Sequence, residues 1–152
     1  MPDLDIGWAD DGLAELAARH GLSFTLLVAP TTPPDRVAGL VGRCSGFVYM
    51  IARLGITGER EMPPDVSGRV AGLRRATALP IAVGFGISRP EHVAAATASA
   101  DAAIVGSAIV RRMGQGPDPA GAAADLVRQL AGGLARRAVA TRPPPGRPRP
   151  AR

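Results

Sequence analysis

The chain has 152 residues and 46% of them are hydrophobic, which is enough for one domain with a packed core. All 18 basic residues are arginine, so an enzyme that uses a lysine amine, for a Schiff base or for pyridoxal phosphate, is excluded. The single cysteine, Cys44, excludes an intrachain disulfide framework and a cysteine zinc site.

The net charge of +5 is concentrated at the end of the chain, where arginines alternate with prolines. We expect residues 137–152 to be a disordered cationic tail. A non-specific nucleic-acid arm is an alternative, but no aromatic stacking residue accompanies the charge, which favours a plain tail and no nucleic-acid partner. No apolar run approaches the roughly 20 residues that span a bilayer. The N-terminus lacks a signal-peptide pattern, so we expect a cytoplasmic protein without membrane contact.

The remainder, residues 1–136, alternates helix patterns with short apolar runs. Residues 10–20 predict a helix with Asp10 as its N-cap and Gly21 at its C-terminal end. Residues 24–28 then predict a strand buried on both faces, and Pro33 or Pro34 begins the next helix. The pattern continues through a helix at 34–43, a strand at 47–51, a helix at 65–76, a strand at 80–84, a helix at 89–97 and a strand at 102–105.

Four strands that are each followed by a helix are typical of parallel βα units in an α/β fold. Right-handed crossovers place every strand-to-helix loop at one edge of the sheet. The last two of these loops, residues 84–88 and 106–109, offer glycines and helix N-termini, which attract anions. Eight-stranded barrels frequently hold a phosphate in the loops after their last two strands. A phosphate site is therefore predicted there, although a glycine after a strand also serves as a simple tight turn.

Four segments resemble the tryptophan synthase alpha chain: LLVAPTTPPDR, GFVYMIARLGITGER, PIAVGFGISRPEHV and ADAAIVGSAIV, in collinear order. The resemblance implies a TIM-barrel type fold, of which residues 1–136 are the C-terminal (βα)4 half barrel with a further helix. It implies a lyase that cleaves indole-3-glycerol phosphate, a phosphorylated small molecule, to indole and glyceraldehyde 3-phosphate in tryptophan biosynthesis. It also implies a beta-chain partner, which alone would hold pyridoxal phosphate, and no cofactor in this chain.

The resemblance also assigns roles to individual residues. The loop ARLGITGERE, residues 52–61, matches a mobile lid that closes over the substrate. Thr57 matches the lid residue that supports a catalytic carboxylate, and Arg53 is a further residue of the lid. Tyr49 matches a tyrosine that lines the site near the catalytic carboxylates. Backbone groups that bind phosphate in the family match Gly58, Gly86, Gly106 and Ser107. Apolar positions around the indole ring match Val28, Phe85 and Ile104, each of which also suits plain core packing.

The family takes its acid/base glutamate and its indole-binding aspartate from the first half of the barrel, which this chain does not match. The carboxylates at hand are not expected to replace them, because they lie in the lid or near the N-terminus: Asp3, Asp5, Glu59 and Glu61. His20 and His92 are expected at the surface. No cluster of His, Asp and Glu has the spacing of metal ligands, so no metal site is predicted.

Two hypotheses for the function follow. In the first, the chain is a lyase half that is inactive alone and active with an N-terminal half. In the second, it is a non-catalytic half-barrel module that retains phosphate binding or beta-chain contact. Another phosphate-binding barrel, such as an isomerase of histidine biosynthesis, explains GFGIS and GSAI but explains ARLGITGERE poorly. A half barrel leaves two edge strands and an apolar interior open, so either the missing half or self-association is expected to cover them.

Overall fold

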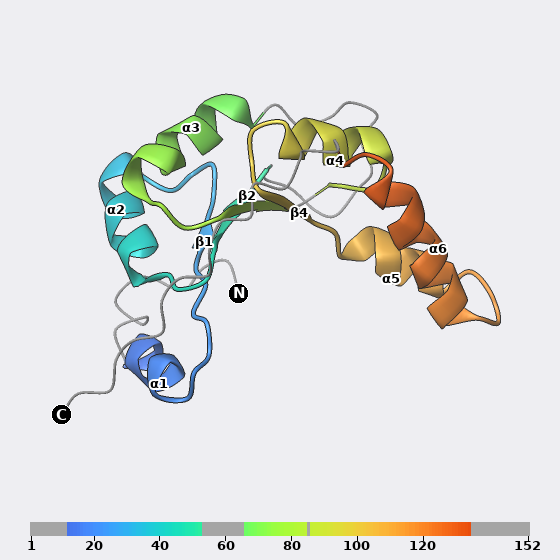
Figure 1. The fold of residues 1–152 in the computed structure, drawn as a ribbon, viewed down its shortest axis with the longest axis horizontal. Helices are drawn as coiled ribbons and strands as arrows, with labels where there is room; N and C mark the ends of the chain where they lie inside the picture. The colour runs from blue at the N-terminus through green and yellow to red at the C-terminus, as the bar shows by residue number, and fades with distance from the viewer. Residues whose placement is uncertain (1–11, 53–65, 85, 135–152) are drawn as a thin grey trace.

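The computed structural model describes residues 12–52, 66–84 and 86–134 (Figure 1). In this part of the chain each of the four strands is followed by a helix, and a further helix comes last, as predicted. The predicted tail, residues 137–152, lies outside the described residues. The elements are α1 (Leu13–Arg19), β1 (Leu27–Val28), α2 (Pro34–Arg43), β2 (Val48–Ile51), α3 (Ser67–Ala76), β3 (Ile81–Gly84), α4 (Pro90–Thr97), β4 (Ala102–Ile104), α5 (Ser107–Met113) and α6 (Pro119–Ala131).

The four strands form one parallel sheet in the order β1-β2-β3-β4. This confirms the α/β prediction. The first strand is shorter than the predicted 24–28, and the backbone shows why. The N–H of Phe24 donates to Ser45 Oγ at 2.8 Å and that of Leu26 to Cys44 Sγ at 3.3 Å. Because these donors bond side chains of the segment that leads into β2, regular pairing begins only at Leu27.

The helix ends follow local rules. At the end of α1, Gly21 has φ 67°, the N–H of Gly21 bonds Ala18 O at 3.1 Å and the N–H of Leu22 bonds Ala17 O at 2.8 Å. This pair of bonds around a left-handed glycine ends the helix where the sequence predicts. Helix α2 begins at Pro34, a position where the missing proline N–H costs no helical bond. The predicted N-cap, Asp10, lies outside the described residues.

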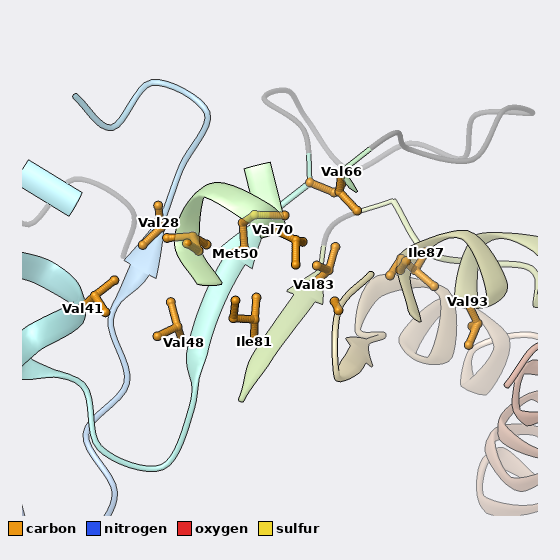
Figure 2. Packing of buried hydrophobic residues seen from close by; sticks show 14 of the residues in the cluster. Val28, Val41, Val48, Met50, Val66, Val70, Ile81, Val83, Ile87 and Val93 are labelled. Atoms are coloured by element: carbon orange, nitrogen blue, oxygen red, sulfur yellow. The ribbon is translucent and has the colours of Figure 1, made fainter. Parts of the chain in front are cut away.

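The hydrophobic core lies between the sheet and the helices (Figure 2). Alternate strand residues such as Val48, Met50 and Ile81 point to this side and are at most 1% exposed. Helix side chains cover them, including Val41 from α2, and Val70, Leu73, Val93 and Ala96 from α3 and α4. The strand residues on the other side of the sheet are apolar as well, and two of them, Ile51 and Ala82, are at most 5% exposed.

The helices form an arc along one side of the sheet. Figure 1 shows α2, α3 and α4 over the sheet, α1 below β1 and away from the sheet in this view, and α6 beyond the β4 end. No helix of the described residues covers the opposite side. That open side is the feature that a half barrel should have. No helix in the described part is long and apolar enough to cross a membrane.

A glycine in α2 allows a direct test of this helix. Gly39 lies in the middle of α2, has an ordinary helical backbone, and a Cβ built there meets no atom within 4 Å. Gly39→Ala should therefore stabilise the fold by about 0.5–1 kcal/mol, because alanine loses less backbone entropy on folding. Chemical unfolding followed by circular dichroism measures the difference. Gly46→Ala is the contrasting variant. Gly46 has φ 95°, and a Cβ built there would lie 2.8 Å from Ser23 Oγ, so alanine should destabilise the fold. A gain in stability for Gly46→Ala would contradict this local geometry.

Candidate active site

The open side of the sheet, which we call the inner face, is built from the strand residues that alternate with the core residues. Tyr49 of β2 lies in register with Leu27 and Ala82, and one step further along Ile51, Gly84 and Ile104 lie in register. Inner-face residues of the described strands carry no charge, and the Tyr49 hydroxyl is their one polar side-chain group: Leu27, Tyr49, Ile51, Ala82, Gly84, Ala102 and Ile104. In barrel enzymes such layers of strand residues line the floor of the site.

Tyr49 lies across Gly84 on the neighbouring strand. A Cβ built at Gly84 would be 2.3 Å from Tyr49 Oη and 2.4 Å from Cε2, so the ring occupies the space that any other residue would fill. Burial raises the pKa of the Tyr49 phenol above its ordinary value of 10.0. At physiological pH the hydroxyl is therefore neutral and can donate a hydrogen bond. The first glycine of GFGIS, Gly84, thus leaves room for the Tyr49 ring at the C-terminal end of the sheet.

The predicted phosphate loops lie at one edge. Gly84 and Ile104 are partners in register at the ends of β3 and β4, so Gly86 and Gly106 each follow this register point by two residues. Gly86 has φ 77°, a conformation that favours glycine, and it is exposed. Gly106 and Ser107 are also exposed, and Ser107 is the first residue of α5. Gly86, Gly106 and Ser107 therefore follow neighbouring strands at the same edge of the sheet, and all three are exposed.

His92 corrects a prediction. It was expected at the surface, but its side chain is 1% exposed. The Ser88 N–H lies 3.3 Å from His92 Nδ1 and donates to it, so the proton of a neutral imidazole is on Nε2. Nε2 is buried and has no hydrogen-bond partner among the described residues. His92 thus holds the end of the GFGIS loop against the first turn of α4. His20, by contrast, is exposed as predicted.

The remaining predicted residues are divided between three places. Val28 is 5% exposed and belongs to the core between the sheet and the helices, where it lines a cleft with Met50, Val37 and Leu73. Ile104 lies in the inner-face register, so the structure does not bring these two together. Four predicted residues lie outside the described residues: Arg53, Thr57, Gly58 and Phe85.

Arg69 was not predicted from the sequence. Its guanidinium, on the first turn of α3, donates to the carbonyl oxygens of Ile51 and, at 3.0 Å, Ala52. Burial lowers the pKa of this guanidinium from its ordinary value. Arg69 therefore fixes the last residue of β2 and the residue that follows it, two and three positions after Tyr49. The signal in the sequence was an arginine among the apolar residues of a helix that follows a glycine-rich loop.

Cys44 is not a candidate nucleophile. Its Sγ accepts the Leu26 N–H and donates to Leu40 O at 3.4 Å, and the partly buried side chain packs against the core. Burial raises the pKa of the thiol above 9.0, and the Leu26 bond opposes this only in part. Alkylation at pH 8 should therefore be slower in the native chain than in the urea-unfolded chain, with the native rate rising at a pH above 9. Equal rates in both states would contradict the burial. The stabilising effect of the neutral thiol is present below pH 9 and is lost as the pH rises through the raised pKa.

The described residues contain no group of side chains that could bind a metal ion. In the described residues no three side chains among His, Cys, Asp and Glu come close enough to hold an ion. Among the described residues, the polar groups that follow the C-terminal ends of the strands include backbone N–H groups and the hydroxyls of Thr32, Ser88 and Ser107, and the Tyr49 phenol lies beside them on the inner face. These hydrogen-bond donors suit a ligand with an uncharged organic part and an anionic end better than they suit a cation.

Comparison with known proteins decides the family. The family model described as tryptophan synthase alpha chain matches residues 1–138. This chain belongs to the tryptophan synthase alpha chain family. The alpha chain of Chloroflexus aurantiacus is 42% identical over 139 residues, which cover 90% of this chain and 52% of that relative. The alpha chain of a Cyanothece species is 46% identical over 137 residues, which cover 86% of this chain and 50% of the relative.

Solved structures agree with the fold. Tryptophan synthase from Mycobacterium tuberculosis superposes with a TM-score of 0.74 at 30% identity, over 87% of this chain and 49% of that chain. The alpha subunit from Campylobacter jejuni gives a TM-score of 0.70 at 33% identity, over 86% of this chain and 52% of that chain. The chain thus spans about half the length of the tryptophan synthase alpha chains that it matches. Its four strands are the half barrel that the sequence predicts.

Proposed function

We propose that this chain supplies the C-terminal half of a lyase that cleaves indole-3-glycerol phosphate to indole and glyceraldehyde 3-phosphate. The observation that carries the proposal is the position of Tyr49, Gly86, Gly106 and Ser107 at one edge of the sheet. The chain that forms this sheet belongs to the tryptophan synthase alpha chain family. The loops after β3 and β4 hold the phosphate through backbone N–H groups. The apolar inner face, with Ile104 and Ile51, receives the indole ring, and the Tyr49 hydroxyl borders it.

Residues outside the described part complete this proposal. Thr57 and Arg53 belong to a lid over the substrate, and Gly58 adds a backbone donor to the phosphate. Phe85 covers the indole ring. Val28 is the weakest member of the proposed site, because its side chain packs among core residues on the helix side of the sheet. Its contribution is to hold β1 in place rather than to touch the ring.

The chemistry requires acid and base groups that the described inner face lacks. In a retro-aldol cleavage an acid protonates the indole carbon, the bond from this carbon to the glycerol chain breaks, and a base removes a proton from the glycerol hydroxyl. Tuned carboxylates perform both proton transfers well. The described inner face carries none. We therefore infer that an N-terminal half supplies the acid and the base, and that the chain alone has no lyase activity.

The decisive experiment measures indole release from indole-3-glycerol phosphate. The purified chain is assayed alone, with the N-terminal half of the Chloroflexus aurantiacus alpha chain, and with a beta chain added to each mixture. We expect indole only when the N-terminal half is present, and more of it when a beta chain binds the reconstituted barrel. No release in any mixture, although the chain is folded and soluble, would rule out the proposed lyase half.

Ser107 offers a sharper test of the phosphate site. Proline is tolerated at the first position of a helix, so Ser107→Pro removes the backbone N–H while α5 is retained. Ser107→Ala removes only the hydroxyl. If the N–H binds phosphate, Ser107→Pro should raise the KM of the reconstituted enzyme about tenfold, as expected for a hydrogen bond to a charged group. Ser107→Ala should have the smaller effect. Equal KM values for the wild type and Ser107→Pro would show that the Ser107 N–H does not bind the phosphate.

A non-catalytic module is the second candidate, and the uncharged inner face is the observation that favours it. Such a module would bind the phosphate end of a ligand, or contact a beta chain, without performing a reaction. Calorimetric titration of the chain alone with indole-3-glycerol phosphate distinguishes the two. Binding at the Ser107 site with no indole release after addition of the N-terminal half would establish the module.

A further inference from the structure

A cleft opens between α2 and α3 on the helix side of the sheet. Its volume is about 400 Å³, within the range of about 300–1,000 Å³ that is usual for small-molecule sites. Figure 1 shows the two helices next to each other over the β1 end of the sheet, and both connect neighbouring strands of the described part. The cleft is therefore formed by elements that this chain already contains. It is lined mainly by Val28, Val37, Met50, Arg69, Leu73 and Arg75.

The interior of the cleft is apolar. Val28 of β1 and Met50 of β2 are partners in register and lie side by side at its floor (Figure 2). These two side chains belong to the core on the helix side of the sheet, so the cleft is separate from the inner face that carries Tyr49. Val37 of α2 and Leu73 of α3 supply further apolar surface. An apolar group of a ligand therefore gains free energy when it leaves water for this cleft.

Arg69 places a positive charge in the wall of the cleft. Its guanidinium is partly buried, and its partners are the carbonyl oxygens of Ile51 and Ala52, which are uncharged. No carboxylate of the described residues pairs with it, and burial lowers the pKa of the guanidinium with no ion pair to oppose the shift. Burying a cation without a counter-charge is unfavourable. A guanidinium has five N–H donors, so Arg69 keeps donors for a ligand while it holds the two carbonyl groups.

Arg75 adds a second positive charge at the rim. A Cβ built at Gly72 would lie 3.9 Å from Arg75 Nη2, so the guanidinium lies back along α3 over Gly72, in the direction of Arg69. Arg75 is exposed, and no carboxylate of the described residues pairs with it. Its neighbour Arg74 differs, because it binds Asp101 with an N–O distance of 2.6 Å. Two arginines without a carboxylate partner in the described part thus meet at one apolar cleft.

We propose that the cleft binds a small organic acid, with an aromatic or branched apolar body in the interior and a carboxylate held by Arg69 and Arg75. Charge complementarity decides the class of ligand. The lining residues include two guanidinium groups and no acidic side chain. The planar fork of a guanidinium matches the two oxygens of a carboxylate. A cation would meet two like charges, and an amino acid such as phenylalanine would bring its ammonium group against the same arginines.

The cleft and the proposed lyase site are distinct. The predicted phosphate loops follow β3 and β4, whereas β1 and β2 form the floor of the cleft. Binding of an acid in the cleft requires neither an N-terminal half nor the lyase reaction. A chain that releases no indole would therefore leave this proposal standing, and a chain that binds no acid would leave the lyase proposal standing.

Calorimetric titration of the full chain tests the class of ligand. The probes are 3-phenylpropionate, its uncharged amide and phenylalanine, which share the same aromatic ring. We expect 3-phenylpropionate to bind, and both other probes to bind about tenfold more weakly or less, because they lack an uncompensated negative charge. Equal affinity for the acid and its amide would overturn the role of the two arginines. No binding of the acid at millimolar concentration would overturn the site itself.

Two substitutions locate the bound acid. Arg75→Gln removes the charge at the rim, and Gly72→Phe fills the space over which Arg75 lies. Each should weaken the binding of 3-phenylpropionate about tenfold or more. Arg112→Gln is the control for charge, because Arg112 is exposed on α5 and does not line the cleft. Gly72→Ala is the control for the helix, because a Cβ at Gly72 meets no atom closer than 3.9 Å.

Both controls should bind the acid as the wild type does, and circular dichroism verifies that each variant keeps the fold. Binding that survives both Arg75→Gln and Gly72→Phe would place the acid elsewhere on the chain and would overturn the proposal.

Discussion

Replacing Gly133 with alanine is expected to lower the free energy of unfolding by about 3 kcal/mol, the upper end of the usual cost of overpacking. A Cβ at this position would lie 2.0 Å from the carbonyl oxygen of Pro90 and 2.7 Å from its carbonyl carbon. These are backbone atoms in the first turn of α4, so no side-chain rotation relieves the overlap. The chain after α6 would have to move away from α4, and the packing of Leu130 in the core would loosen.

Urea unfolding followed by circular dichroism measures this loss. Gly116→Ala is the matched control, since Gly116 precedes α6 and a Cβ there meets no atom within 4 Å. Its unfolding midpoint should stay within the small range of ordinary surface substitutions. If Gly133→Ala and Gly116→Ala unfold at the same urea concentration, the close approach of α6 to α4 is wrong.

The elements of the fold could be predicted because their signals are local. The proline that begins α2 and the left-handed Gly21 that ends α1 act through their own backbone conformation, so each marks a helix end without any tertiary contact. The parallel order of the strands followed from the alternation of short apolar runs with helices. These features need no knowledge of which side chains meet.

The faces of the strands could not be predicted in the same way. In the continuous run of residues 24–28 every position is compatible with burial, so the sequence does not show which side chains point to the helices. Only the register with β2 places Val28 beside Met50, on the core side. His92 was misplaced for a related reason. Its 1% exposure results from tertiary packing around the start of α4, which the local sequence does not show.

The candidate site was predicted as a set of positions, and the structure adds the relation between them. GFGIS indicated a phosphate loop through Gly86, but nothing local in the sequence indicated that Gly84 makes room for the ring of Tyr49. Arg69 was missed because an arginine in a helix usually faces solvent, and its two carbonyl partners follow only from the position of α3 against the end of β2. Contacts between strands and between layers are therefore the part that sequence alone does not supply.

Gly84→Ala tests the seat of Tyr49 directly, because Tyr49 is the single tyrosine of the chain. The new Cβ would lie 2.3 Å from Oη and 2.7 Å from Cζ, so the ring must swing off β3 toward the open inner face. A more exposed phenol loses the desolvation that raises its pKa. The absorbance of the phenolate should therefore titrate at lower pH in the variant, closer to 10.0, than in the wild type. Gly39→Ala, which lies in α2 far from this ring in sequence, should leave the titration unchanged.

The same substitution links stability and activity to one contact. A raised phenol pKa means that the neutral ring stabilises the fold fully below pH 10.0, and that this contribution is lost as the pH rises through the raised pKa. Gly84→Ala should therefore flatten the alkaline loss of stability while it lowers stability at neutral pH by about 1–3 kcal/mol. In the reconstituted enzyme a ring displaced by an ångström or more should reduce kcat about a hundredfold. A variant that keeps both the wild-type phenol titration and full activity would show that Tyr49 does not lie across Gly84.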